Sequence, residues 1–581
     1  MNEGFLPPTT AGIFPENFSD ELAFSRSGKI TAIILIVMIA IGFGLRVNDL
    51  GTESLGEDEL NKLQTVEEYR TNGLSGKNGE HPFLMKGLQT ASVSAGERLG
   101  VSDEASLRFP VALFGAFTTL ILFLLVGELF GRSIALVSAA LYAVEPIAIG
   151  FDRIAKEDSL VLFFFLLTNF LWIRGQTLAE RGIERWPRYA FGAGVAFAAL
   201  MASKYYPHLL AVTAAYYNIY EYVPQRNWRI GGRRWFLFCV VTAVAFVVLN
   251  PTIVLPDTWH EMLKFSSENR IGHDGYEFMG ELYTHKATAW LSGIPWTFYY
   301  VFIAVKTSLP VLVLFLIGLP MMFLKRLGDG RFFIFFWAFM WFVPFSVLGG
   351  KFTRYFTLAE PLILITAATG FYFSVKWLSS KLKLANSVAV VLQTTLFVGL
   401  VGVSFLNSVS SGPHYRMFTN MPGGGEAAAG TYFPHDEFYD AQSRDVVEAV
   451  ARWAKPNATV ACETPTVYEY YAAKLGRSDL KFVVLSDKTK VASLKANDFV
   501  VDARGRRYFS NTPYLDLLHR MESASRTPVD VLIDGVPAAR MLFTDSPHPL
   551  SLPVTLGKLP AARVYFLDEG AAAELRTLAA Q

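Results

Sequence analysis

The chain is poor in cysteine and carries no excess charge of either sign. It has two cysteines in 581 residues, Cys239 inside an apolar run and Cys462 in a distant polar region. Two isolated cysteines supply neither a disulfide framework nor a metal-ligand set, and they disfavour redox chemistry. The formal net charge is +1, and the lysines and arginines are dispersed along the sequence. Because nucleic-acid binding requires concentrated basic surface, we exclude nucleic acid as a partner.

The sequence also lacks a cleavable signal-peptide pattern, an internal repeat and a low-complexity tract. Its first apolar run, residues 30–45, begins late and is followed by Arg46 and polar chain. A signal peptide instead places a short apolar region directly before a small-residue cleavage site. We therefore interpret this run as a first membrane span that is retained.

Long apolar runs, in contrast, are abundant. Hydrophobic residues make up 52% of the chain and aromatic residues 14%, and the mean hydropathy is +0.31. This composition is typical of a polytopic membrane protein. Runs close to the length that a bilayer requires predict about eleven transmembrane helices, near residues 29–46, 109–130, 133–150, 158–174, 189–203, 207–223, 235–250, 306–324, 332–349, 356–376 and 386–406.

Basic residues predict the orientation of these helices, because lysine and arginine accumulate in short cytoplasmic connections. With residues 1–28 in the cytoplasm, most inside connections are basic, among them "RGQTLAERGIERWPR", "QRNWRIGGRRW" and "LKRLGDGR". An odd number of spans then places residues 407–581 outside. The predicted transmembrane module covers residues 29–406, with large outer loops at 51–108 and 250–306.

The region 407–581 differs in composition from the rest of the chain. It opens with a polar, glycine-rich stretch that includes "TYFPHDEFYD". Its acids and histidine leave a catalytic role as the alternative, but we favour a linker. Helical runs such as "DVVEAVARWA" then alternate with short apolar strands such as "ATVAC", "KFVVLS", "DVLIDG" and "ARVYFLD". This alternation predicts an extracytoplasmic C-terminal α/β domain.

Charged residues of both signs gather on the predicted outer face. Taken alone, the acidic run "GEDEL" fits a solvated helix N-terminus, where carboxylates favour the positive end of the helix dipole. Acids and bases at the outer ends of several helices favour an active site, because holding a phosphate and deprotonating a nucleophile requires both in one cleft. The candidates are Glu57, Asp58, Glu59, His81, Lys86, Arg153, Lys156, Glu157, Asp158, Lys204, Lys351 and Arg354.

Several of these segments resemble a known family. The acidic pair of the first outer loop, "HPFLMK", "LRFPVALFGAFTTLILFLLVGELFG", "RIAKEDSLVLFFFLL" and "GAGVAFAALMASKYYPHLL" look like the membrane module of protein O-mannosyltransferases. They are also similar to bacterial transferases that attach aminoarabinose to lipid A. Both groups belong to the glycosyltransferase C superfamily. The resemblance covers about residues 29–380 and rests on the order, sidedness and spacing of the motifs.

The resemblance implies a membrane glycosyltransferase with a polyprenyl-phosphate-linked sugar as donor. An acceptor hydroxyl attacks the anomeric carbon on the extracytoplasmic side. Asp58 matches the catalytic base of the family and Glu59 its second acid. The remaining expected site residues are the phosphate-binding cations Lys86, Arg153, Lys204 and Arg354, and a second acidic element of Asp158 with Glu157 and His81.

This chain departs from the family pattern in two places. Phe83 stands where the family has a second proline after its histidine. Eukaryotic members carry an inserted lumenal domain in a later loop, for which the loop 250–306 has no room. The extra domain here lies at the C-terminus, so the acceptor is not implied, and protein, lipid and cell-envelope glycan all remain open. We expect a bacterial inner-membrane protein whose C-terminal domain recognises the acceptor.

The expected chemistry follows from the leaving group. Polyprenyl phosphate leaves only when fixed cations meet its growing charge. The sequence alone leaves either Asp58 or Glu57 as the base, and the resemblance favours Asp58. Direct attack with one carboxylate base predicts inversion at the anomeric carbon. One phosphate does not require a metal, so we predict no required cofactor, while carboxylates near His81 leave a divalent cation as an open alternative.

Two other functions compete with the transferase. A secondary transporter or lipid flippase would bury charges near the bilayer midplane and show two related halves, whereas these charges lie at outer helix ends. A non-catalytic scaffold would bind a partner through its C-terminal domain. The aromatic stretch 290–300 could stack on sugar rings but is more typical of an interfacial belt. His273, Asp274 and His285 of the same outer loop fit a donor-sugar contact and a surface loop without a ligand role equally well.

Overall fold

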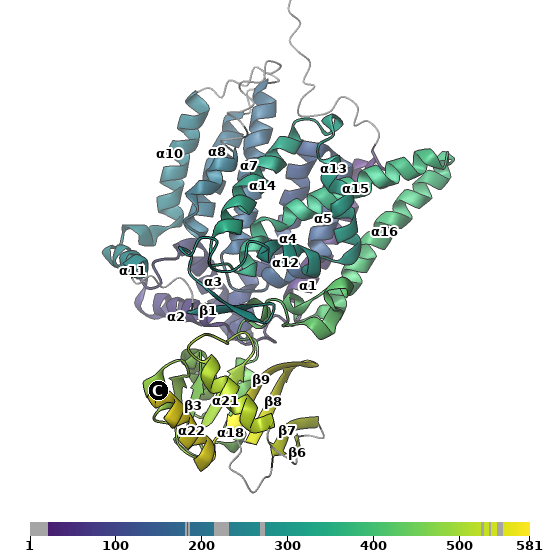
Figure 1. The fold of residues 1–581 in the computed structure, drawn as a ribbon. Coiled ribbons are helices and arrows are strands. Elements are labelled where there is room, and N and C mark those ends of the chain that lie inside the picture. The colour runs from purple at the N-terminus through teal and green to yellow at the C-terminus, as the bar shows by residue number, and fades with distance from the viewer. Residues whose placement is uncertain are drawn as a thin grey trace, which may run out of the picture.

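The computed structural model describes residues 21–180, 183, 186–213, 216, 232–267, 273–523, 528–533, 536–542 and 550–581. Most of the predicted segments 1–28 and 207–223, and the basic connection 224–231, lie outside these residues. A large helical part is followed by a sheet with its own helices, which Figure 1 shows below the helical part.

Helices account for most of the predicted transmembrane module. They are α1 (Gly28–Val47), α4 (Asp103–Phe130), α5 (Arg132–Val144), α6 (Pro146–Phe151), α7 (Asp158–Glu180), α8 (Trp186–Ser203), α10 (Gly232–Leu249), α13 (Leu309–Met321), α14 (Gly330–Val347), α15 (Glu360–Lys381) and α16 (Asn386–Ser411).

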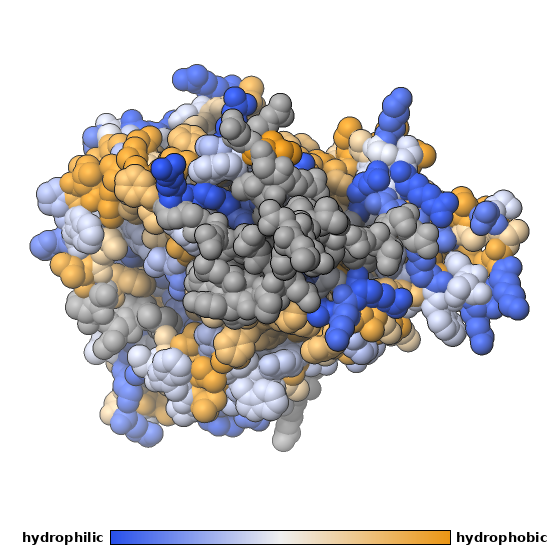
Figure 2. Space-filling model, turned by 90° about the horizontal axis from the view of Figure 1, so that it is seen from above, coloured by the Kyte–Doolittle hydropathy of each residue, from blue (hydrophilic) through white to orange (hydrophobic). Residues whose placement is uncertain are grey.

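Six helices within the described residues, α1, α4, α7, α14, α15 and α16, are long and apolar enough to cross a membrane, and α5 and α13 are shorter apolar helices. Large hydrophobic side chains such as Ile36, Val248 and Leu406 are exposed on α1, α10 and α16. Figure 2 shows hydrophobic surface on the flanks of the helical part. The chain is an integral membrane protein with a mostly helical fold.

One predicted span is interrupted, and another is shorter than predicted. The segment 133–150 divides into α5 and α6 at Glu145, directly before Pro146, which lacks the N–H that a continuous helix requires. The predicted span 306–324 corresponds to α13, which begins at Leu309 with Pro310 in its first turn, and α12 (Phe298–Lys306) ends directly before it.

The predicted outer loops contain much regular structure. The loop 51–108 forms α2 (Glu57–Asn72), α3 (Phe83–Leu99) and the start of α4. Phe83 is the first residue of α3, directly after Pro82, so the departure from the family pattern opens a helix. The loop 250–306 holds η3 (Pro251–Val254), α11 (Pro256–Ser267), the hairpin β1 (Gly275–Phe278) with β2 (Glu281–Thr284), and α12. The short helix η5 (Thr353–Leu358) precedes α15.

The region after α16 contains a seven-stranded mixed sheet of order β4-β3-β5-β9-β8-β7-β6. Its strands are β3 (Thr459–Cys462), β4 (Lys481–Val484), β5 (Phe499–Ala503), β6 (Pro528–Ile533), β7 (Val536–Leu542), β8 (Leu550–Leu556) and β9 (Leu559–Phe566). Strands β3, β4 and β5 are parallel, and β9 pairs antiparallel with β5.

Alternating residues give this sheet two apolar faces. Val460 and Val564 pack with α18 (Ser443–Trp453) and α19 (Pro465–Lys474). Ala461 and Tyr565 pack with α21 (Thr512–Ser523) and α22 (Glu569–Ala580). The strands predicted from "ATVAC", "KFVVLS", "DVLIDG" and "ARVYFLD" correspond to β3, β4, β6 and β9.

Two glycines allow α13 and α15 to pack in close contact. A Cβ added at Gly318 would lie 1.9 Å from the carbonyl oxygen of Thr366, and one added at Gly370 would lie 2.1 Å from that of Leu314. Small residues of this kind let membrane helices approach backbone to backbone. The contact supports α15, and η5 with Arg354 directly precedes that helix.

We expect Gly370→Ala to lower the thermal unfolding temperature of the purified protein in detergent. The added methyl group meets backbone that cannot move aside, and overpacking of this kind costs about 1–3 kcal/mol. Gly399→Ala on α16 is the control, because a Cβ there meets nothing within 4 Å. Equal unfolding temperatures for the two variants would contradict the close packing.

Candidate active site

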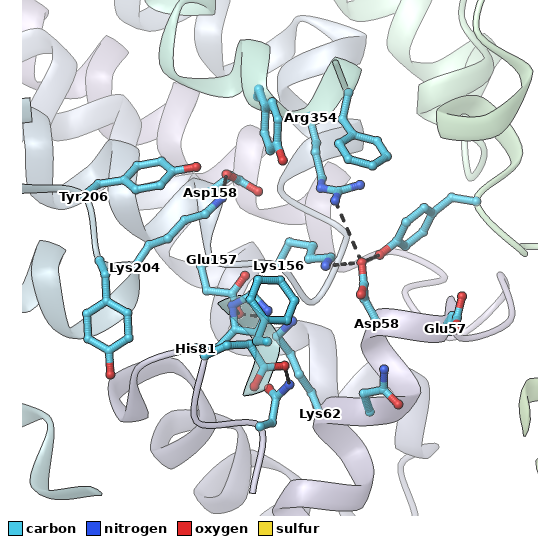
Figure 3. Close-up of a pocket in the computed structure, with 18 of the residues that line it drawn as sticks. Glu57, Asp58, Lys62, His81, Lys156, Glu157, Asp158, Lys204, Tyr206 and Arg354 are labelled. Atoms are coloured by element: carbon cyan, nitrogen blue, oxygen red, sulfur yellow. Dashed lines mark hydrogen bonds and ion pairs between the residues drawn. The ribbon is translucent and has the colours of Figure 1, made fainter. Parts of the chain in front are cut away.

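A cavity of about 780 Å³ opens at the helix ends next to the predicted outer loops, and we call it the outer cavity. Figure 3 shows its charged side chains pointing toward one another from several different elements. The cavity is lined by Glu57, Asp58, Asn61, Lys62, Asn78, Glu80, His81, Lys156, Glu157, Asp158, Lys204, Tyr205, Tyr206, Glu261, Lys264, Phe265, His273, Phe352, Arg354, Tyr355, His435, Tyr439 and Arg506.

Asp58 lies in the first turn of α2, with its side chain 42% exposed to the cavity. Its Oδ2 forms an ion pair with Lys156, lies 3.9 Å from Arg354 Nη2, and accepts a hydrogen bond of 3.2 Å from the hydroxyl of Tyr439. Burial alone would raise the pKa of Asp58, but Lys156 and Arg354 hold it well below its usual value. Asp58 is therefore an ionised carboxylate in a cationic setting.

Glu157 forms a second charged cluster beside it. Its Oε1 lies 3.1 Å from Lys62 Nζ and 3.4 Å from His81 Nδ1. Burial, together with the charges of Lys62 and Lys156, lowers the pKa of His81 to about 3 even though Glu157 opposes the shift. Burial lowers the pKa of Lys156 to about 8, against the pull of Asp58. His81 is thus a neutral hydrogen-bonding group at physiological pH.

Lys204 and Asp158 form a third pair in another part of the cavity, with Nζ 2.8 Å from Oδ1. The rings of Tyr206 and Tyr355 flank the ammonium group, at 4.7 and 5.2 Å from their centroids. The Arg354 guanidinium lies 4.0 Å from the ring centroid of Phe352. Cations held over aromatic faces present fixed positive charge with little surrounding water.

The structure brings six of the nine expected site residues into this cavity: Asp58, His81, Glu157, Asp158, Lys204 and Arg354. Glu59, Lys86 and Arg153 do not line it. Arg153 donates to four backbone carbonyls, including those of Arg46 and Asn48 at the end of α1. Lys86 Nζ donates to the carbonyl of Asn78 at 2.8 Å. These two cations hold backbone turns, so we do not include them in a phosphate site.

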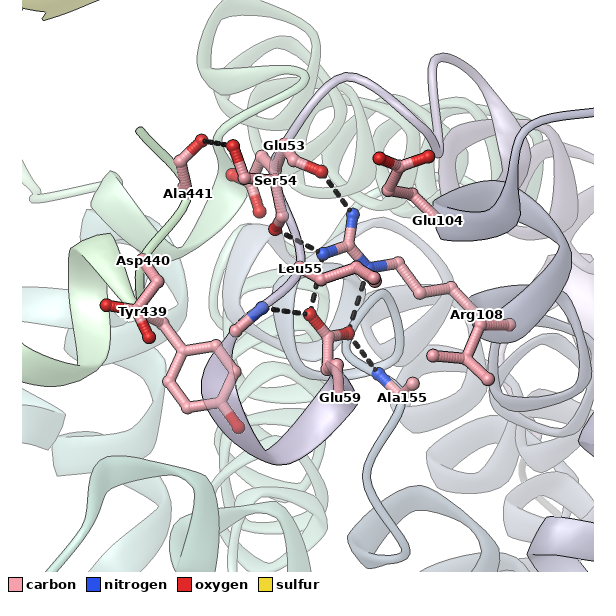
Figure 4. A network of polar contacts seen from close by, with 12 residues as sticks. Glu53, Ser54, Leu55, Glu59, Glu104, Arg108, Ala155, Tyr439, Asp440 and Ala441 are labelled. Atoms are coloured by element: carbon pink, nitrogen blue, oxygen red, sulfur yellow. Dashed lines mark hydrogen bonds and ion pairs between the residues drawn. The ribbon is translucent and has the colours of Figure 1, made fainter. Parts of the chain in front are cut away.

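Glu59 instead anchors the site from behind, through a buried ion pair with Arg108 (Figure 4). Arg108 Nε and Nη2 donate to the two carboxylate oxygens at 2.9 and 2.7 Å, and neither side chain is more than 4% exposed. Glu59 also accepts from the backbone N–H groups of Gly56 and Ala155, at 2.9 and 2.7 Å. One carboxylate thereby fixes both the start of α2 and the turn that carries Lys156.

Sequence reasoning missed several residues of the site. Lys62 carried a usable signal, because it lies four positions after Asp58 on α2 and therefore on the same helix face. Lys156 was a candidate without an assigned role. Tyr439, His435 and Arg506 come from the region after α16, where no local pattern indicates a contact with the first outer loop.

The other candidates fall in different places. His273 lines the outer cavity, and Asp274 accepts from the backbone N–H of Ser510 at 2.8 Å. His285 is buried against the rings of Tyr276 and Phe352. None of residues 290–300 lines the outer cavity. Within the described parts of the chain, no group of three or more His, Cys, Asp or Glu side chains is arranged to hold a metal ion.

The sequence is similar to one protein family. Residues 81–254 match the model of the dolichyl-phosphate-mannose-protein mannosyltransferase family, which covers less than half of the chain. A search of curated proteins finds no match.

Several solved structures resemble this chain. An oligosaccharyltransferase from Archaeoglobus fulgidus in the apo form has a TM-score of 0.50 and 12% identity, covering 81% of this chain and 69% of its own. ArnT from Cupriavidus metallidurans bound to undecaprenyl phosphate has a TM-score of 0.45 and 14% identity, covering 91% and 97%. The S. cerevisiae Pmt1-Pmt2 complex bound to the sugar donor has a TM-score of 0.30 and 16% identity, covering 44% and 39%.

The oligosaccharyltransferase match shows a shared fold. The family-model match shows in addition that residues 81–254 are similar in sequence to dolichyl-phosphate-mannose-protein mannosyltransferases.

The buried pair behind the site yields a stability prediction. Arg108→Leu leaves Glu59 as an unpaired buried charge, which costs about 3–5 kcal/mol, so we expect a strongly lowered thermal unfolding temperature in detergent. Adding Glu59→Leu removes that charge and should recover part of the loss.

Arg70→Leu is the matched control, because Arg70 pairs with Glu67 and Glu97 at the surface, where such pairs contribute at most about 1 kcal/mol. Equal effects of Arg108→Leu and Arg70→Leu would contradict the anchoring role of the buried pair.

Proposed function

We propose that this chain is a membrane glycosyltransferase of the glycosyltransferase C superfamily, which transfers a sugar from a polyprenyl-phosphate carrier to an acceptor hydroxyl. The observation that carries the proposal is the meeting, in one outer cavity, of the ionised carboxylate Asp58 with the cations Lys156, Arg354 and Lys204. A cavity with both a proton acceptor and fixed positive charge can activate a hydroxyl and stabilise a departing phosphate. The family-model match, which is named for a dolichyl-phosphate sugar donor, supports the same donor class.

The donor phosphate binds beside Lys204 and Arg354. Both cations line the cavity next to aromatic side chains, Tyr206 and Tyr355 for Lys204 and Phe352 for Arg354. Such a setting is poorly hydrated, so a phosphate bound there gains more from each charge than it would in water. As the bond to the anomeric carbon breaks, the same cations stabilise the negative charge that develops on polyprenyl phosphate.

Asp58 accepts the proton of the incoming hydroxyl. With Lys156 and Arg354 paired to it, the carboxylate is a weak base, as its lowered pKa reflects. A donor phosphate that enters beside Arg354 shares these cations, which weakens their hold on Asp58 and raises its basicity. Attack without a covalent enzyme intermediate gives inversion at the anomeric carbon.

The same proposal includes the membrane topology and the location of the protein. Its topology has about eleven spans, a cytoplasmic N-terminus and residues 407–581 as an extracytoplasmic domain, as the positive-inside rule predicts for these basic connections. We assign it to a bacterial inner membrane, with 407–581 as the region that recognises the acceptor. Three cavity residues from this region, His435, Tyr439 and Arg506, support a role in the site.

The first experiment uses purified protein in nanodiscs with a panel of polyprenyl-phosphate sugars, and detects released polyprenyl phosphate by mass spectrometry. We expect Asp58→Asn to lose about a hundredfold or more of the release, because a positioned base contributes at least that much. Donor affinity should be unchanged or tighter, because the substitution removes a negative charge beside the phosphate cations.

Glu261→Gln, on α11 of the same cavity, is the control and should retain activity. Absence of donor binding and of release by the wild type across the panel would refute the transferase. Full activity of Asp58→Asn would instead transfer the role of base to Glu57.

The phosphate site is tested by direct binding of polyprenyl phosphate. Lys204→Met should weaken binding by about tenfold to a hundredfold, which is the contribution of one charge-assisted hydrogen bond. Lys286→Met, an exposed lysine of the outer loop that does not line the cavity, controls for general loss of charge. Unchanged affinity for Lys204→Met would remove Lys204 from the phosphate site.

A further inference from the structure

The segment Tyr439–Asp440 connects the membrane part to the sheet-bearing part and reaches back to α2. It directly follows the short helix α17 (Pro434–Phe438), within the stretch that the sequence marks as a linker. Both residues have a left-handed backbone, with φ of 45° at Tyr439 and 60° at Asp440. Side-chain-bearing residues rarely adopt this conformation, and two in succession indicate that surrounding contacts hold them there.

Tyr439 fits against the residue at which α2 begins. Its side chain is buried, and its hydroxyl donates to Asp58 Oδ2 at 3.2 Å. A Cβ added at Gly56 would lie 2.5 Å from Tyr439 Cε1 and 2.9 Å from Cδ1. The ring therefore occupies space that only a glycine at position 56 leaves open.

Asp440 completes the contact at the neighbouring residue. Gly56 has no side chain to cap α2, and Asp440 Oδ2 accepts the N–H of Glu57 at 3.2 Å instead. The Asp440 carboxylate is itself held by Arg506, whose Nε donates to Oδ1 at 2.7 Å. The first turn of α2 is thus capped by a residue that lies 383 positions away along the chain.

We infer that Tyr439 is a positioning residue for Asp58, and that the Tyr439–Asp440 segment completes the active site from the region beyond the last membrane helix. The inference rests on the proposed function of Asp58 as the base. Lys156, Arg354 and Tyr439 all approach the same oxygen, Oδ2. Asp58 Oδ1 takes part in no hydrogen bond or ion pair with the described residues. The three groups therefore orient the carboxylate so that Oδ1 is free to accept the proton.

The test compares wild type, Tyr439→Phe and Tyr470→Phe, as full chains in nanodiscs, in the polyprenyl-phosphate release assay. Tyr439→Phe should lower release at saturating donor by about ten- to a hundredfold, as expected for a misplaced catalytic group, and leave polyprenyl phosphate binding unchanged. Tyr470→Phe removes a comparable bond, from Tyr470 to Asp103 Oδ2 at 2.7 Å, which also joins the two parts of the chain but lies outside the cavity. It should retain wild-type release.

A pH profile separates positioning from a general structural role. The tyrosine hydroxyl favours the ionised form of Asp58, so its loss should move the acid limb of the release profile to higher pH. Tyr470→Phe should not move it. The charged and titratable groups that act on Asp58 are Glu57, Lys62, His81, Lys156, His273, Arg354 and Tyr439, and all but Tyr439 are retained in the variant.

Gly56→Ala probes the other side of the contact, because its methyl group displaces the ring, and it should reproduce the loss seen for Tyr439→Phe. Hydrogen–deuterium exchange at residues 57–60 supplies a measurement that does not depend on activity, and exchange there should rise in both variants. Unchanged release, pH profile and exchange in Tyr439→Phe would overturn the inference, as would an equal loss of polyprenyl phosphate binding. Failure of the wild type to turn over any donor would instead refute the proposed function, while exchange still reports on the contact.

Discussion

The outer cavity depends on the buried ion pair between Glu59 and Arg108. Neither charge can leave its partner without becoming an unpaired charge away from water. The pair also binds backbone from three segments, because Arg108 donates to the carbonyls of Glu53 and Ser54 while Glu59 accepts from Gly56 and Ala155. The start of α2, the turn before it and the turn before α7 are therefore fixed relative to one another by a single interaction.

Adjacent residues take opposite roles because of helix geometry. Successive residues on a helix point about 100° apart, so Asp58 faces the cavity while Glu59 faces the interior. The same division occurs in the turn before α7, where the backbone of Ala155 binds Glu59 and the side chain of Lys156 binds Asp58. Two short stretches, the start of α2 and the turn before α7, thus supply both the buried contacts that hold the site and the side chains that line the cavity.

The sequence predicts the parts of this arrangement that depend on local pattern. Hydropathy locates the membrane helices, and the acidic run marks the first turn of α2. Arg108 was not predicted, because it lies at the edge of an apolar run and its partner is 49 positions earlier. Lys86 and Arg153 were expected at the phosphate because of their positions in the sequence motifs. Position in a motif, however, does not tell whether a cation faces a ligand or the backbone. The break at Glu145 was not predicted, because the hydropathy of that run is continuous. Pro146 could have indicated it.

The stretch "TYFPHDEFYD" shows most clearly why composition could not reveal the whole site. A preceding glycine-rich segment and polar side chains are typical of a linker, yet five of its polar side chains bind distant partners. Asp436 Oδ2 accepts from Tyr276 at 2.6 Å and from the backbone N–H of Thr353 at 2.7 Å, directly before Arg354. Asp440 caps α2. The same stretch therefore orders the backbone on both sides of the cavity, next to Asp58 and next to Arg354. The segment therefore ties the region after α16 to the position of Asp58. Under the proposed function, binding of an acceptor by that region and alignment of Asp58 are physically coupled.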